Sequence, residues 1–287
     1  MSPVKERIAT TVRERATRSG KPPRRAYQHY FIEDEGLHSR IHLQNFYSTF
    51  WPEIDAAATA NIQLFGADGK LVGTTTREVV RFGCAFIEAR DLLAEFGSDE
   101  REGTIAIDLA PAGEVSKRFD ELPKPDVVEV HTPFWMAYYD DGENYMYVHS
   151  IEMLEGEVYG TTKPVEWHIN RGTAAAADPG AWRSWRLLES SGLSELQVVA
   201  INHRASPGAT KIGVYTADDA LVAERSVEFA PRQLQRVRFT ADEIASGLER
   251  SGGPALLRIG LDPLLTANGK PYVLMRYDNG PLSLHHG

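Results

Sequence analysis

One stretch of thirteen residues occurs twice in the sequence, and this repeat constrains the fold more than any other feature. The first copy runs from Ala60 to Val72 and reads ANIQLFGADGKLV; the second runs from Thr210 to Val222 and reads TKIGVYTADDALV. The copies align without a gap. Each has alternating residues, a turn that contains Asp, and a return segment that begins with Leu-Val, which is the pattern of a β-hairpin. The repeat therefore predicts two hairpins of the same geometry.

Shorter matches flank the two hairpins in the same order. They are Phe31-Ile32-Glu33 with Leu187-Leu188-Glu189, Gln44-Asn45 with Ile201-Asn202, Asp91-Leu92-Leu93 with Glu243-Ile244-Ala245, Ile105 to Asp108 with Ile259 to Asp262, and Tyr139 to Gly142 with Tyr277 to Gly280. The offset between partners changes from block to block, as expected where insertions fall in loops. We interpret the chain as two copies of one unit. Two unrelated β domains with similar turns are the alternative.

Short strand patterns separated by Gly, Pro and Asp turns dominate both halves, and helical spacing is confined to a few segments. This predicts an all-β fold made of two tandem β-sandwich domains from an internal duplication, with a short N-terminal arm that is helical or disordered. The predicted parts are the arm at 1–26, the first sandwich at 27–151, a connector at 152–181 and the second sandwich at 182–287. Within the first sandwich, Glu78 to Phe86 is predicted as one strand.

The net charge of −9 is unevenly distributed along the chain. Residues 1–25 carry eight Lys or Arg against two Glu, and the remainder carries 23 basic against 38 acidic residues. An acidic body disfavours nucleic acid as a partner. The basic arm is expected to dock on that body, or to reach an anionic partner or another subunit, which makes a homo-oligomer one expectation.

No apolar run approaches the length of a membrane span, and the N-terminus lacks the apolar core of a signal peptide. We therefore expect a cytoplasmic location without membrane insertion. The one cysteine, Cys84, excludes an internal disulfide. Because apolar residues flank it, we expect a buried and unreactive thiol.

Several segments of the second half resemble the sensory rhodopsin transducer family of small β-sandwich proteins. They are Trp185 to Glu189, Val199 to Asn202, Val214-Tyr215, Pro231-Arg232 and Val237 to Phe239. The resemblance covers most of the second copy and, more faintly, the first. It implies a β-sandwich that forms oligomers and acts by binding rather than by chemistry, with a carbohydrate-like ligand as the inferred class. The duplication, the arm and the connector depart from the family, and no catalytic residue can be carried over.

Histidines are the first candidates for a site. His149 and His285 occupy matching places near the ends of the two copies, and His286 follows; with His38 and His42 they would supply enough imidazoles to bind a ligand or a metal ion. However, no tight His spacing occurs within one strand, and His285 and His286 point to opposite faces of a strand. Structural or surface roles are the alternative, and we commit to no metal.

Aromatic residues crowd one predicted hairpin. Trp135 and Tyr139, with Tyr138, Tyr145 and Tyr147, supply flat rings that stack on sugars or bases and polar tips that form hydrogen bonds. Packing in the core is the alternative, because alternating aromatics usually fill a sandwich.

Matching polar residues are expected to serve turns. Asn45 and Asn202 end equivalent strands, and the pairs Asp108 with Asp262 and Asp140 with Asp278 suggest turn chemistry more than paired catalytic carboxylates.

No phosphate-binding glycine loop and no nucleophile-elbow motif occurs in the sequence. The all-β duplication, the absence of catalytic signatures and the family resemblance favour a non-enzymatic binding or adaptor protein that recognises a small polar ligand, such as a carbohydrate, or a protein partner, without a cofactor. A metal-assisted enzyme with a His and Asp site between the two domains is the first alternative. A structural or assembly protein that uses its Arg-rich arm is the second.

Overall fold

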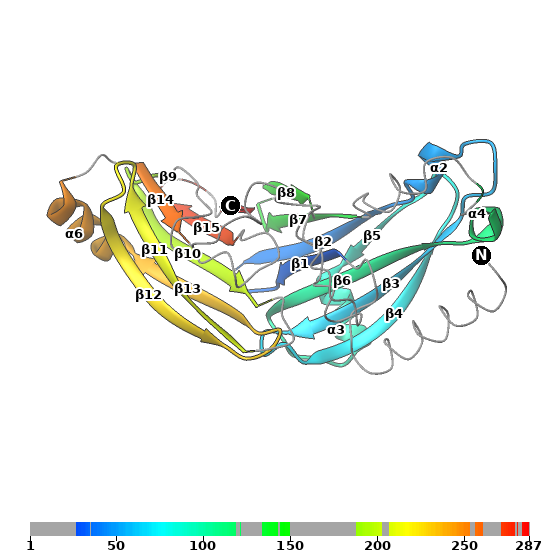
Figure 1. Cartoon of the computed structure of the whole chain (residues 1–287), viewed down its shortest axis with the longest axis horizontal. Coiled ribbons are helices and arrows are strands. Elements are labelled where there is room, and N and C mark those ends of the chain that lie inside the picture. The colour runs from blue at the N-terminus through cyan, green and yellow to red at the C-terminus, as the bar shows by residue number, and fades with distance from the viewer. Residues whose placement is uncertain are drawn as a thin grey trace. The chain divides into compact units, whose positions relative to one another are not determined.

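The computed structural model describes residues 27–34, 36–118, 121, 134–142, 144–149, 188–202, 207–252, 256–260, 271–278, 280 and 283–286. The predicted arm at 1–26 and the predicted connector at 152–181 lie outside the described residues. The chain divides into two units (Figure 1), one formed mainly by the elements before residue 150 and the other mainly by those after residue 187. The two units are described separately below.

The first unit contains two antiparallel sheets. In chain order its elements are β1 (Tyr27–Ile32), β2 (Leu37–Gln44), α2 (Tyr47–Phe50), β3 (Ala58–Gly66), β4 (Leu71–Val79), β5 (Cys84–Glu88), α3 (Ala89–Glu95), β6 (Glu102–Pro111), α4 (Gly113–Arg118), β7 (Phe134–Asp140) and β8 (Tyr145–His149). One four-stranded sheet has the order β1-β6-β3-β4, and the other has the order β5-β2-β7-β8.

The second unit repeats this arrangement. Its elements are β9 (Leu188–Glu189), β10 (Leu193–Ile201), β11 (Gly208–Thr216), β12 (Leu221–Phe229), β13 (Leu234–Thr240), α6 (Ala241–Ser251), β14 (Leu256–Gly260), β15 (Tyr272–Tyr277) and β16 (Ser283–His286). The sheet orders are β9-β14-β11-β12 and β13-β10-β15-β16. Each strand of the second unit therefore occupies the place of the strand eight positions earlier, which confirms the predicted fold class of two duplicated β-sandwiches.

The repeated hairpins agree residue by residue. In β3 and β4, Ala58 pairs with Val79 and the register slips between Leu64 and Phe65; in β11 and β12, the same pairs and the same slip recur 150 residues later. The turns are closed by equivalent bonds, from Gly66 N to Lys70 O at 3.0 Å and from Thr216 N to Ala220 O at 2.9 Å. One sequence pattern has therefore produced one backbone geometry twice.

A β-bulge explains one change in the offset between copies. The Leu37 and Leu193 amides both close a turn whose glycine has positive φ, and these residues are 156 positions apart. The strand ends at Gln44 and Ile201 are 157 positions apart. The extra residue is Ser194, where the pairing of β10 with β15 shifts between Leu193 and Glu195.

Asn45 and Asn202 stabilise the same turn in both copies. The amide nitrogen of Asn45 donates to the carbonyls of Ala56, Val79 and Val80 at 2.6, 3.1 and 3.1 Å. Asn202 donates to Ala230 O, which is the equivalent of Val80, at 3.0 Å. The predicted role of these two side chains in turns is thus confirmed.

The core of each unit lies between its two sheets. In the first unit, Tyr138 on β7 reaches across the sandwich and donates its hydroxyl hydrogen to Tyr30 O on β1 at 2.7 Å. In the second unit, Tyr277 on β15 donates in the same way to Glu189 O on β9 at 2.9 Å. The inward tyrosine of the first copy is therefore Tyr138, and the sequence match of Tyr139 with Tyr277 is displaced by one residue.

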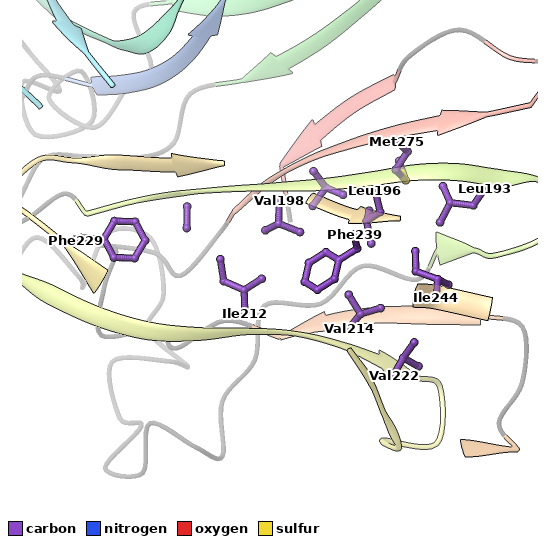
Figure 2. Close-up of a cluster of buried hydrophobic side chains, with 12 residues drawn as sticks. Leu193, Leu196, Val198, Ile212, Val214, Val222, Phe229, Phe239, Ile244 and Met275 are labelled. Atoms are coloured by element: carbon purple, nitrogen blue, oxygen red, sulfur yellow. The ribbon is translucent and has the colours of Figure 1, made fainter. Parts of the chain in front are cut away.

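Figure 2 shows the core of the second unit, where Phe239 lies among aliphatic side chains from facing strands. The buried cluster consists of Leu193, Leu196, Val198, Ala200, Ile212, Val214, Val222, Phe229, Phe239, Ile244, Val273 and Met275. Ile244 comes from α6, which begins with a capping box between Thr240 and Glu243. In the first unit, Leu92 on α3 is the buried equivalent of Ile244.

In each unit, a glycine lets two elements approach closely. They are the segment that follows β5 or β13 and the edge strand of the other sheet, β4 or β12. A Cβ added at Gly73 on β4 would lie 2.4 Å from the Phe96 ring, and one added at Gly247 on α6 would lie 2.4 Å from Val222 O on β12. A side chain at either position would displace this contact.

Three sequence predictions need correction. The segment from Glu78 to Phe86 is not one strand, because β4 ends at Val79 and a turn in which Phe82 has φ of 55° precedes β5. Cys84 is exposed rather than buried, because it begins β5 on the outward side. Asp108 is buried in the middle of β6 and does not serve a turn.

Candidate functional site: an aromatic face on the first sandwich

Strand β2 separates its polar and apolar residues by strict alternation. Ile41 and Leu43 are buried towards the core, whereas His38, Arg40 and His42 are half-buried on the outward side. This alternation places two of the candidate histidines on one face of the sheet β5-β2-β7-β8.

Strand β5 adds an outward row beside β2. Phe86 lies directly opposite His42, and Glu88 lies directly opposite Arg40. The Arg40 Nε atom is 2.5 Å from Glu88 Oε1, so these two charges compensate each other. Phe86 is 64% exposed, although large apolar side chains are usually covered in a sandwich.

His42 is the centre of an aromatic cluster. Its ring centroid is 4.6 Å from that of Phe86 and 5.3 Å from that of Tyr147 on β8, both in edge-to-face geometry. Because β7 lies between β2 and β8, and neighbouring strands are about 4.8 Å apart, the His42 and Tyr147 rings must lean over β7. Ala137, the small outward residue of β7, is fully buried as this arrangement requires.

Trp135 on β7 extends the same outward surface. Its side chain is 44% exposed, and that of Tyr147 is 56% exposed. We call the outward surface formed by His42, Phe86, Trp135 and Tyr147 the aromatic face. Exposed Trp and Tyr rings offer a flat apolar surface together with a polar tip, which suits ligands that are themselves flat and hydroxylated.

Tyr139 and Tyr145 lie near the turn between β7 and β8. Their rings stack with centroids 5.2 Å apart, and Tyr139 is mostly buried whereas Tyr145 is exposed. Asp140 fixes this turn by accepting hydrogen bonds from the backbone amides of Gly142 and Asn144 at 2.9 and 3.0 Å. Turn chemistry is therefore confirmed for Asp140.

His38 makes a separate side-chain hydrogen bond at the start of β2. Its Nδ1 atom is 2.9 Å from Glu33 Oε2, and Glu33 also accepts from Ser39 N at 2.9 Å. Burial raises the pKa of the Glu33 carboxyl above its ordinary value, against the opposing effects of Ser39 and His38. The His38 contact with the buried Glu33 indicates a local structural role.

The remaining candidate histidines are on the last strand of each unit: His149 is on β8, and His285 and His286 are on β16. His285 pairs with Val273 and contacts Ser283 Oγ through Nε2 at 2.7 Å, and the backbone of His286 pairs with that of Tyr272. Among the described residues, no group of three or more His, Cys, Asp or Glu side chains forms a metal site. The side chains of His149 and His286 lie outside the described part, and the metal-assisted alternative stays a prediction.

The second copy does not repeat the His42 and Phe86 pair of the aromatic face. At the register positions of His42 and Phe86, the pair of β10 with β13 has Val199 opposite Arg236. Duplication has kept the scaffold and changed the outward residues. At this pair the first copy has two aromatic rings where the second has an aliphatic and a charged side chain.

Sequence reasoning identified His42 and Trp135 but missed Phe86, Arg40 and Glu88 as parts of this surface. The signal was present, because alternation through Phe86-Ile87-Glu88 places the first and third residues on one side. The prediction that Cys84 is buried hid this signal. Residues 84 and 86 lie on the same side of a strand, so a buried Cys84 would have placed Phe86 in the core as well.

The pKa of His42 gives the aromatic face a pH dependence. Burial lowers this pKa below its usual range, the Arg40 guanidinium lowers it further, and Glu88 opposes both. In the unfolded chain the pKa returns to about 6.5, so the unfolded chain takes up the proton first as the pH falls. The contribution of His42 to stability is thus complete above about pH 6.5 and decreases below it.

We expect His42→Phe to flatten the pH dependence of the unfolding free energy between about pH 7.5 and 5. Chemical denaturation of wild type and variant across this range measures the difference, which isolates His42 from Glu33 because Glu33 is present in both proteins. A difference between the two proteins that does not vary with pH would contradict the assignment.

Comparisons with known proteins leave the family open. No family model matches the chain and no curated protein matches it. The resemblance to the sensory rhodopsin transducer family therefore stays a prediction.

Solved structures similar to this chain include a Bacteroides uniformis β-glucuronidase, with 10% identity over 91% of this chain and a TM-score of 0.17. Others are a β-glucuronidase from glycoside hydrolase family 2, with 12% identity over 90% of this chain and a TM-score of 0.16, and a glycosyl hydrolase family 2 member from Bacteroides cellulosilyticus, with 9% identity over 90% and a TM-score of 0.16. The chain spans 25%, 23% and 27% of these structures. Likeness at this level carries no information about what the chain binds.

No helix in the described part of the chain is both long and apolar enough to cross a bilayer.

Proposed function

We propose that this chain is a non-enzymatic binding protein and that the aromatic face of its first sandwich holds a neutral carbohydrate. The observation that carries the proposal is the set of exposed rings on one sheet. Among the described residues, the exposed aromatic side chains are Phe82, Phe86, Trp135, Tyr145 and Tyr147, and all except Phe82 lie on β5, β7 or β8. Such rings stack on the C–H faces of sugars, and the Tyr and Trp tips supply hydrogen bonds.

The charges around the aromatic face favour a neutral ligand. Arg40 and Glu88 compensate each other at 2.5 Å, and the lowered pKa of His42 keeps its ring uncharged at neutral pH. The described outward positions of these strands therefore carry no net charge that would select an anion such as a nucleotide. The acidic composition of the rest of the chain also disfavours nucleic acid.

Binding rather than hydrolysis is supported by the carboxylates of this sheet. Glycoside hydrolysis generally needs two carboxyl groups facing the bond that is broken. The described outward positions of β2, β5, β7 and β8 carry one carboxylate, Glu88, and it is paired with Arg40. A sugar on this face would therefore be held without being cleaved.

Calorimetric titration of the full chain with neutral oligosaccharides tests the proposal. Trp135→Ala and Tyr147→Ala are each expected to weaken binding by about 0.5–1.5 kcal/mol for the lost ring contact, up to roughly tenfold in Kd. Phe82→Ala is the matched control, because Phe82 is 62% exposed but belongs to the turn between β4 and β5.

Three results would oppose the proposal. Wild type that binds no neutral oligosaccharide is one, and equal losses in Trp135→Ala and Phe82→Ala are another. Release of reducing ends from any oligosaccharide would instead favour an enzyme.

A further inference from the structure

Strand β5 has an apolar edge that faces outward. It is the end strand of the sheet β5-β2-β7-β8, so none of the described strands of that sheet pairs with its other side. Phe86 on the strand is 64% exposed, and Val80 and Phe82 in the turn before it are 68% and 62% exposed. Large apolar side chains gathered in this way on a protein surface usually mark a place where another molecule binds.

The backbone of β5 directs alternate residues towards this edge. Asn45 N donates to Gly83 O at 3.1 Å, in line with the register of β2 and β5. In an antiparallel ladder the hydrogen-bonded pairs recur at every second residue, so the bonds to β2 are made by the odd-numbered residues of β5. The even-numbered residues turn their N–H groups to the open edge; they are Cys84, Phe86 and Glu88.

The equivalent edge in the second copy is charged. Strand β13 occupies the place of β5, and it has Arg236 and Arg238 at the register positions of Phe86 and Glu88. Proteins commonly place charges on end strands, because a charge there opposes pairing with the edge of another molecule. The one charge on β5 is Glu88, and Arg40 of the same sheet compensates it. The edge of β5 thus lacks the repulsive charge that the second copy has.

The edge of β5 is complementary to itself. When two β5 strands lie antiparallel with Phe86 opposite Phe86, the even-numbered residues of the two strands face each other. The two Phe86 backbones then exchange both of their hydrogen bonds, and Cys84 of each strand lies opposite Glu88 of the other. The pairing therefore matches open backbone groups with open backbone groups and apolar side chains with apolar side chains.

The exposed charges beyond the two ends of β5 are also complementary. Arg81 precedes the strand by three residues and Asp91 follows it by three, and both are exposed. An antiparallel pairing brings the start of one strand beside the end of the other, so each Arg81 comes to the end where the other molecule has Asp91. Arg90, which lies next to Asp91, interacts electrostatically with Glu33 of its own molecule.

We propose that two molecules of this chain pair through their β5 strands, antiparallel and about a two-fold axis at Phe86. The two sheets β5-β2-β7-β8 then form one continuous sheet, and two-fold symmetry is the commonest symmetry of homodimers. The outward surfaces of both sheets lie on the same side, with the two Phe86 rings next to each other. Each molecule thereby adds an aromatic ring to the aromatic face of the other. The pairing does not depend on what that face binds.

The exposed area at this edge predicts a weak dimer. A fully covered aromatic side chain buries about 150–250 Å², so the uncovered parts of Phe82 and Phe86 amount to roughly 250 Å² in each molecule. With Val80 and the strand backbone, the pairing stays near the lower limit of about 1,000 Å² for specific interfaces. Sedimentation equilibrium of the full chain is therefore expected to show a monomer–dimer equilibrium with a Kd of roughly 1–100 μM.

One variant places at this edge the residue that the second copy has there. Phe86→Arg sets two like charges opposite each other at the two-fold axis, and it is expected to weaken the dimer by at least about tenfold. Leu221→Arg is the matched control, because it makes the same kind of change at an apolar residue of β12 that is 50% exposed. The control variant is expected to dimerise as wild type does.

Cysteine crosslinking tests the register of the two strands. Cys84 is the one cysteine of the chain, so the double variant Cys84→Ser with Phe86→Cys has a single thiol, at the two-fold axis. Hydrogen-bonded residues in an antiparallel pair have Cα atoms about 5.5 Å apart, which a disulfide can bridge. Mild oxidation is expected to link the double variant into dimers. In wild type the two Cys84 residues are about 13 Å apart along the strands, too far for a disulfide.

Any of three results overturns the proposal. The first is a wild-type protein that stays monomeric at concentrations well above the expected Kd. The second is a Phe86→Arg protein that dimerises as tightly as wild type, which would place the interface on another surface. The third is a double variant that oxidation links no better than wild type. All these measurements are made without a sugar, so their outcome is separate from that of the proposed sugar binding.

Discussion

Phe239→Ala is expected to lower the unfolding free energy of the second unit by about 3–5 kcal/mol. The ring is fully buried among aliphatic side chains from both sheets of the unit, as Figure 2 shows, so its removal leaves a cavity that the rigid strands cannot close. The Arg225 guanidinium carbon lies 5.0 Å from the centre of this ring, and that contact is lost as well. Urea denaturation followed by circular dichroism measures the change.

Leu221→Ala is the control for Phe239→Ala. Leu221 is 50% exposed at the start of β12, so its truncation is expected to change the unfolding free energy by no more than about 0.5 kcal/mol. A loss below about 1 kcal/mol in Phe239→Ala would show that the two sheets do not enclose a packed core at this position.

Asn45→Ala is expected to destabilise the first unit by about 2–4 kcal/mol. The Asn45 amide nitrogen serves the carbonyls of Ala56, Val79 and Val80, and the side chain is 97% buried. Alanine leaves these acceptors without their donor, and each buried unpaired group costs about 1–3 kcal/mol. The same denaturation experiment, followed by the transition of the first unit, gives the value.

The neighbouring Gln44→Ala provides the comparison, because Gln44 is exposed at the end of β2 and its loss should be small. Asn202→Ala is expected to destabilise the second unit, since Asn202 holds the equivalent turn. An Asn45→Ala protein as stable as Gln44→Ala would show that the turn does not depend on this side chain.

The duplicated scaffold could be predicted from sequence because its signals are local. Leu64 and Val214 sit in hairpins whose turn, length and alternation recur at a constant spacing, and the register follows from that pattern alone. The matched blocks at Ile105 and Ile259 occupy equivalent places in the structure, since these residues lie opposite Leu64 and Val214 in the two sheets.

Two of the three errors, the single strand from Glu78 to Phe86 and the buried Cys84, arise where a non-glycine residue adopts an unusual backbone conformation. Phe82 and Arg232 both have positive φ in the turn before the fifth strand of their copy, and neither residue type signals such a turn. Without that turn, β4 and β5 merge into one predicted strand. The residues that follow are then assigned to the wrong face, which is why Cys84 was expected to be buried.

The aromatic face could be predicted only in part, because it depends on pairing between distant segments. Trp135 and His42 were candidates by residue type, but nothing local places Phe86 opposite His42 or brings Tyr147 to it across β7. The burial of Gln63 on β3 could not be predicted for a related reason. A glutamine in a strand reads as an exposed residue, and its burial is decided by tertiary structure.

The most direct test of the sugar-binding account is a crystal structure of the full chain with the neutral oligosaccharide that binds best. The account predicts a pyranose ring lying parallel to the Trp135 or Tyr147 ring on the outward side of β5-β2-β7-β8, with its hydroxyl groups within reach of Arg40 and Glu88. An oligosaccharide bound on any other surface, with these rings uncovered, would contradict it.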